Sequence, residues 1–136
     1  MSEKGSAAGR ARTRHAFRYT RDRSPEQVFA VADYLRARRG FSSDQEMAEV
    51  LAVHRSRLNA WKQGAELPNP QNAQLLSHLA VVVNELREFL DPDVISDWLV
   101  TGQATLGGRT PVAALRAGQL AEVLQSANAT EHGAFI

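Results

Sequence analysis

Residues 44–63, DQEMAEVLAVHRSRLNAWKQ, predict two short helices joined by a tight turn. Ser43 and Glu46 form a capping-box pattern at the start of the first helix, and Gly64 ends the second. Ala48 is small enough for the point where the helices touch, and Ala52 lies at the turn. The apolar residues spaced for the inner face are Met47, Leu51, Val53, Leu58 and Trp61. This pattern is typical of a helix-turn-helix.

The outer face of the second helix is polar and basic, and no acidic residue lies on it. Its side chains are Arg55, Ser56, Arg57, Asn59 and Lys62. Guanidinium groups bind guanine or phosphate and amides bind adenine, so Arg55, Arg57 and Asn59 are candidates for reading base edges in a major groove. We expect Lys62 to contact phosphate whatever the DNA sequence. The alternative is a helical hairpin whose basic face meets only solvent.

Two residues beside this helix are further candidates for DNA contact. Gln45 lies near the start of the first helix, where free N–H groups favour phosphate. His54 directly precedes the second helix, and its side chain either caps that helix or contacts a phosphate; capping is the favoured interpretation. Because one recognition helix makes few contacts, we expect a homodimer or higher multimer on a two-fold DNA site.

Helical patterns continue on both sides of residues 44–63, and no stretch alternates as a strand would. The helix starts are marked by Ser24-Pro25, Asn69-Pro70, Asp91-Pro92 and Thr110-Pro111, and Gly40 marks one helix end. The sequence therefore predicts an all-α chain in three parts. Residues 1–23 are a basic arm that cannot fold alone, residues 24–89 the helix-turn-helix domain, and residues 90–136 a smaller helical domain with a C-terminal tail.

Charge is distributed unevenly along the 136 residues, although the net charge is only +1. Residues 1–23 carry seven basic and two acidic side chains, whereas residues 67–136 carry three basic and seven acidic ones. The N-terminal end therefore suits a polyanion, and the arm either lies on phosphates or is a solvated tail.

Composition excludes several classes of function. The chain has no cysteine, so it forms no disulfide and no thiolate zinc site, and its four histidines lack metal-ligand spacing. We therefore expect no metal, no cofactor and no catalytic residues. His78 with Glu85, and Asp93 with Asp97, are spaced as ordinary surface pairs on helices. Without a bilayer-length apolar run or a secretion signal, we expect no membrane contact and a cytoplasmic location.

The end of the helix-turn-helix carries a more specific pattern. Trp61-Lys62-Gln63-Gly64, followed by Pro68, resembles the corresponding segment of the Xre family of helix-turn-helix proteins. The chain departs from that family at Ala52, where glycine is usual, and at His54, where serine is usual. Alanine with a positive φ costs about 1 kcal/mol, so we expect an adjusted turn.

The C-terminal part of the chain carries a series of short motifs, in order Trp98-Leu99, Leu106-Gly107-Gly108, Thr110-Pro111, Leu115, Gly118 with Val123-Leu124, and Gly133-Ala134-Phe135-Ile136. This series resembles the toxin-binding domain of the Xre/MbcA/ParS antitoxins. It implies the antitoxin of a type II pair whose partner is a RES-domain, NAD-consuming toxin. Such an antitoxin masks the toxin's active site and represses the shared operon by binding operator DNA.

The toxin contacts that the resemblance implies are Trp98, Leu106, Arg109, Pro111, Leu115, Gly133, Phe135 and Ile136. The residues themselves leave alternatives open. Trp98 favours a core position, Arg109 either pairs with a partner or faces water, and Phe135-Ile136 either packs on the chain or anchors in a partner cleft. We expect removal of residues 129–136 to leave the fold and DNA binding intact and to release the toxin. The alternative function is a stand-alone repressor whose C-terminal half only dimerises.

Overall fold

The computed structural model describes residues 24–134, and this part of the chain is helical without strands, as the sequence predicted. The helices are α3 (Pro25–Arg38), α4 (Asp44–Leu51), α5 (Arg55–Gln63), α6 (Pro70–Leu86), α7 (Pro92–Leu99), α8 (Pro111–Arg116) and α9 (Leu120–Ala129). A short 3₁₀ helix, η1 (Ala104–Leu106), precedes α8, and a π-helical turn, η2 (Thr130–Ala134), follows α9. The predicted basic arm, and Phe135 and Ile136, lie outside the described residues.

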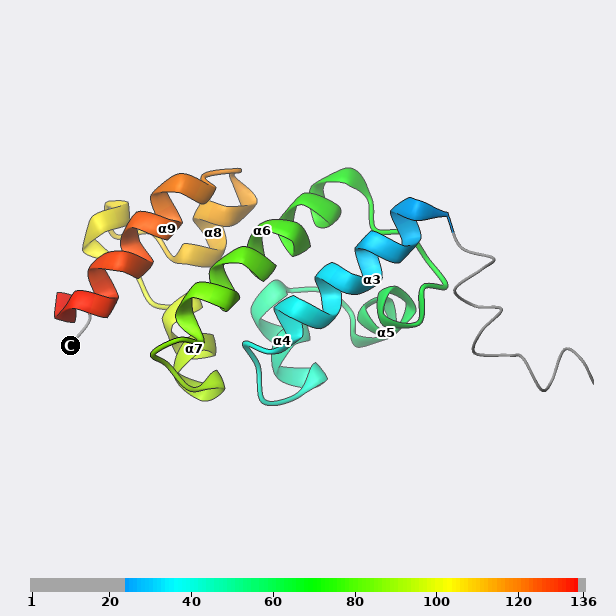
Figure 1. The fold of residues 1–136 in the computed structure, drawn as a ribbon, viewed down its shortest axis with the longest axis horizontal. Coiled ribbons are helices and arrows are strands. Elements are labelled where there is room, and N and C mark those ends of the chain that lie inside the picture. Colours follow the sequence, from blue (N-terminus) through cyan, green and yellow to red (C-terminus); the bar gives the residue numbers. More distant parts are fainter. Residues whose placement is uncertain (1–23, 135–136) are drawn as a thin grey trace, which may run out of the picture.

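The longest of these helices, α6, runs through the middle of the molecule and joins its two ends (Figure 1). At one end α3 packs along α6, and α4 and α5 lie beneath α3. At the other end α8 and α9 pack on α6, with η1 beside α9 and α7 below them. The helix-turn-helix and the C-terminal helices therefore lie at opposite ends of one central helix.

Local capping chemistry sets most of the helix starts. Ser24, Ser43, Asn69 and Thr110 each accept a hydrogen bond from a backbone N–H of the first turn. Ser24 and Gln27 form the full capping box that the sequence predicted. Glu46 differs from the prediction, because its Oε1 accepts from the N–H of Ser42 rather than that of Ser43 (2.7 Å).

Gly40 serves a purpose other than the predicted helix stop. The helix ends at Arg38, and Gly40 does not adopt the left-handed conformation of a terminating glycine. A Cβ at this position would lie 2.7 Å from Cγ2 of Val83 and 3.2 Å from Cγ2 of Ile95. Glycine is therefore required because the α3–α4 turn packs closely on α6 and α7.

One hydrophobic core connects both halves of the described chain. Trp61 of α5 and Trp98 of α7 are both almost fully buried, and α6 contributes Leu79, Val83 and Leu86 to the same cluster. The buried cluster crosses the predicted domain boundary after residue 89 without interruption. The division of the chain into two domains at this point stays a prediction.

Candidate nucleic-acid interface and C-terminal partner surface

The turn between α4 and α5 is left-handed at a non-glycine residue. Ala52 has φ 56° and ψ 43°, and among the described residues it alone combines a side chain with positive φ. The expectation of an adjusted turn is wrong: alanine adopts the conformation that favours glycine. The N–H of Val53 then donates to the carbonyl of Ala48 (3.1 Å), which closes the turn.

The second helix presents the predicted outer face to solvent. Leu58 and Trp61 are each 1% exposed and hold α5 against the core. The side chains predicted to contact DNA, Arg55, Ser56, Arg57, Asn59 and Lys62, are all exposed. The side chains of Arg55 and Asn59 have no hydrogen-bond or ion-pair partner within residues 24–134. Two hollows in the protein surface lie along this face of α5, one lined in part by Arg57 and the other by Asn59.

The basic face is nevertheless bordered by acids that come from outside α5. Glu66 Oε2 lies 3.7 Å from Arg57 Nη1, and Asp44 Oδ2 accepts a hydrogen bond from Lys62 Nζ (3.3 Å). The outer face of α5 itself carries no acidic residue, as the sequence predicted, and the neighbouring carboxylates belong to the segments on either side of it. Both pairs are at least partly exposed to solvent, so each contributes little to stability.

His54 occupies the N-cap position without capping through its side chain. Its backbone carbonyl accepts from the N–H groups of Arg57 and Leu58, at 3.0 and 3.1 Å, but its ring makes no capping hydrogen bond. The favoured interpretation of a side-chain cap is therefore wrong. The exposed ring lies instead in the hollow beside Arg57. Gln45 is also exposed, and its amide donates to Glu49 Oε2 (3.0 Å).

Asp44, the first residue of α4, connects α3, α4 and α5. Its Oδ1 accepts hydrogen bonds from the Tyr34 hydroxyl and from Arg38 Nε, each at 2.7 Å, while Oδ2 faces Lys62. The Tyr34 and Arg38 hydrogen bonds lower the pKa of Asp44 to about 2, and burial raises the pKa of Tyr34. Sequence reasoning missed this residue, because an aspartate at a helix start looks like an ordinary first-turn acid.

Four of the residues predicted to contact a toxin are buried among the C-terminal helices. Trp98, Leu106, Pro111 and Leu115 are buried, so in this structure their side chains lie beneath the surface. The Trp98 ring N–H donates to the Thr130 hydroxyl (2.9 Å), which donates in turn to the Ser126 carbonyl (2.9 Å). The core interpretation of Trp98 is confirmed, and toxin contact by these residues stays a prediction.

Arg109 and Gly133 are the exposed members of the predicted toxin set within the described chain. Arg109 follows a glycine turn that brings two backbones unusually close. A Cβ on Gly102 would lie 2.5 Å from the Gly108 carbonyl oxygen, and the Gln103 N–H donates to the Arg109 carbonyl (3.0 Å). The sequence showed the glycines of this turn but not their mutual approach.

One hydrogen bond links the C-terminal helices to the helix-turn-helix. The Arg116 guanidinium, in the last turn of α8, donates to the carbonyl of Leu51, the last residue of α4. A cation is favourable at a helix C-terminus, where carbonyls lack helical partners. Arg116 therefore supports the end of α4 immediately before the turn at Ala52.

Residues 24–134 lack two further kinds of feature, a cluster of metal ligands and a helix able to cross a membrane. No three side chains of His, Asp or Glu come together as metal ligands. Within the same residues, none of the helices combines the length and the apolar character that crossing a bilayer requires.

Comparison with known proteins gave one informative likeness. No family model and no curated protein matches the sequence. A chain in the crystal structure of the M. tuberculosis MbcT-MbcA toxin-antitoxin complex is similar, with a TM-score of 0.63 and 26% sequence identity. The match covers 80% of this chain and 98% of that chain. The protein is therefore similar to a component of a toxin-antitoxin complex.

Proposed function

We propose that this protein is the antitoxin of a toxin-antitoxin pair, and that it binds DNA with α4–α5 and its toxin with residues 90–136. The observation that carries the proposal is the likeness to a chain of the MbcT-MbcA toxin-antitoxin complex. Because that match covers 80% of this chain, it includes more than the helix-turn-helix domain and extends into the C-terminal helices.

The proposed toxin is a RES-domain enzyme that consumes NAD, and the antitoxin masks its active site. The support is the resemblance of residues 98–136 to antitoxin toxin-binding domains. Arg109 and Gly133 supply exposed contacts, and Phe135 and Ile136 supply apolar anchors. The buried Trp98, Leu106, Pro111 and Leu115 act by holding the shape of this surface. The antitoxin itself has no catalytic residue and needs no cofactor.

In this proposal the protein represses the shared operon by binding operator DNA through α4–α5. Arg55, Arg57 and Asn59 face base edges, and their exposure on a helix held by Leu58 and Trp61 supports this assignment. The phosphate contacts are assigned to Gln45, His54, Ser56 and Lys62. Lys62 exchanges its ion pair with Asp44 for one with a phosphate. Its contribution to DNA affinity is therefore independent of the DNA sequence and sensitive to salt.

Co-expression with the product of the neighbouring gene tests the antitoxin function. We expect that product alone to stop growth and deplete NAD, and co-expression of the full chain to restore both growth and NAD. The two proteins should also copurify. A neighbouring product that is harmless and does not bind the chain would overturn the proposal. Specific promoter binding by the chain alone would then favour the stand-alone repressor.

A further inference from the structure

An apolar hollow of about 370 Å³, the α3 groove, lies between the first turns of α3, the loop before α6 and the first turns of α6. Its lining residues are Glu26, Phe29, Ala30, Asp33, Leu67, Pro68, Pro70, Ala73 and Leu76. Positions 26, 29, 30 and 33 share one face of a helix, so the lining is continuous along α3. None of the residues proposed to contact DNA or toxin belongs to it.

Two large apolar side chains of the α3 groove are open to solvent. Phe29 is 67% exposed, more than any other large hydrophobic residue within 24–134, and Leu67 is 47% exposed. Leu76, by contrast, is buried beneath them. Single exposed apolar residues are ordinary, but two that line the same apolar hollow indicate a surface that another group covers.

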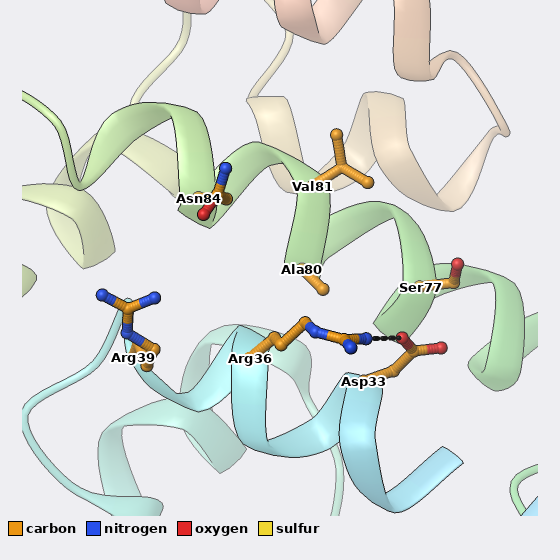
Figure 2. Close-up of a pocket in the computed structure, with 7 residues that line it drawn as sticks. All are labelled: Asp33, Arg36, Arg39, Ser77, Ala80, Val81 and Asn84. Carbon is orange, nitrogen blue, oxygen red and sulfur yellow. Dashed lines mark hydrogen bonds and ion pairs between the residues drawn. The ribbon is translucent and has the colours of Figure 1, made fainter. Parts of the chain in front are cut away.

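The charged residues of the α3 groove are acidic. Glu26 has no ion-pair partner within residues 24–134, whereas Asp33 is paired with Arg36 (3.3 Å). Figure 2 shows that pair at the edge of the neighbouring polar hollow. Among the described residues, no basic side chain lines the α3 groove. The groove therefore suits an occupant that combines apolar rings with positive charge.

The chain carries a segment of this composition directly before α3. Residues 14–21, RHAFRYTR, contain three arginines and no acid, and Phe17 and Tyr19 are the only Phe, Tyr or Trp residues in 1–23. Tyr19 precedes Ser24, the N-cap of α3, by five residues, which can span up to about 17 Å. Because the groove begins at Glu26, in the first turn of α3, both rings can reach it.

We propose that residues 14–21 bind in the α3 groove of their own chain, with Phe17 and Tyr19 on its apolar lining and a neighbouring arginine beside Glu26. The short connection to Ser24 favours this occupant over a separate molecule, because a tethered segment has an effective concentration of about millimolar. The inference does not rest on the toxin or DNA assignments, because it is measured on the chain alone.

A single spin label provides the sharpest test, since the chain has no cysteine to interfere. In full-length Ala16→Cys a nitroxide lies next to Phe17, and NMR measures how far it broadens each backbone amide signal. We expect the amides of Ala30 and Ala73, which line the groove, to lose most of their intensity. The amide of Asp93, in α7 beyond the far end of α6, should keep its intensity.

Substitutions on both sides of the contact should release the segment. We expect Phe17→Ser with Tyr19→Ser, and separately Phe29→Ser, to restore the groove amides to full intensity, and Glu26→Gln to restore them in part. Leu35→Ser is the matched control for Phe29→Ser, because Leu35 is 53% exposed on the same helix but does not line the groove. The broadening should persist in this control, and circular dichroism should show equal helix content in all variants.

Three outcomes would overturn the inference. One is that the groove amides keep their intensity in the labelled chain, and another is that their broadening survives Phe17→Ser with Tyr19→Ser. The third uses a mixture of spin-labelled chains with isotope-labelled chains that carry no spin label. Broadening of the groove amides in that mixture would assign the groove to the arm of another copy, whereas we expect none.

Discussion

The Tyr34 hydroxyl donates a 2.7 Å hydrogen bond to Oδ1 of Asp44, and thereby ties α3 to the first turn of α4. Arg38 binds the same oxygen, and Lys62 of α5 binds the other. The relative positions of three helices thus depend on one carboxylate in the domain proposed to bind DNA.

Replacing Asp44 tests this dependence. We expect Asp44→Ala to lower the free energy of unfolding by about 2 kcal/mol, since charged hydrogen bonds are lost. The folded pKa of about 2 lies below the usual 3.8, so this contribution is complete above the higher value and disappears as pH falls to the lower one. Urea unfolding at several pH values should therefore show the two chains converging in acid. Asp93→Ala, at another helix start, is the control, and an equal loss there would contradict the assignment.

The two cations of α5 should differ in their effect on DNA binding. We expect Arg57→Ala to lower the preference for operator over unrelated DNA, because a base contact is lost at a cost of about 1–3 kcal/mol. Lys62→Ala should weaken both DNAs alike and reduce the salt dependence. Fluorescence anisotropy at matched salt measures both effects. Unchanged operator preference in Arg57→Ala would remove its assignment to base reading.

Ala52 offers a stabilising substitution. Its φ of 56° strains any residue with a Cβ, so Ala52→Gly should raise the free energy of unfolding by about 1 kcal/mol. Thermal unfolding provides the measurement. Ala48→Gly, within the same α4, is expected to destabilise, because that alanine is buried in regular helix. A loss of stability in both variants would show that the strain at Ala52 is negligible.

The glycine turn before α8 should tolerate no side chain at Gly102. In Gly102→Ala the new Cβ would meet the Gly108 carbonyl oxygen at 2.5 Å, so the turn must open and Arg109 must move. We expect toxin affinity to fall while operator affinity stays within about twofold, because the turn surrounds η1, which packs mainly on α9 rather than on α4 or α5. Titration calorimetry with the toxin and anisotropy with DNA separate the two. Full toxin affinity would exclude this turn from the interface.

The C-terminal tail requires a more careful truncation than the sequence suggested. Removing residues 129–136 would delete Thr130, whose hydroxyl accepts the hydrogen bond from the buried Trp98 ring. We therefore expect that truncation to destabilise the fold by about 1–3 kcal/mol. A chain ending at Gly133 should stay folded, bind DNA and fail to neutralise the toxin in a growth-rescue assay. Neutralisation by this shorter chain would refute the role of Phe135 and Ile136.

Local chemistry explains which parts of the structure were predictable. Helix starts at Ser24 and Asn69 depend on residues within one turn, so reading them needs no tertiary information. The burial of Leu58 and Trp61 follows in the same way from helical spacing.

Features that depend on distant segments were not predictable. The carboxylates facing Arg57 and Lys62 come from the loop after α5 and from the start of α4. The site residue Asp44 is defined by partners on two other helices. Likewise, the burial of Leu106 and Leu115 depends on the packing of the C-terminal helices against one another.

The hydrogen bond from Arg116 to the Leu51 carbonyl bears on how the molecule can be divided. A fragment ending at residue 89 would retain every side chain assigned to DNA but would leave the final carbonyl of α4 without its cation. The helix would then fray next to a turn that is already strained at Ala52. The segment proposed to restrain an enzyme therefore also supports the helix on which the segment proposed to read a promoter depends.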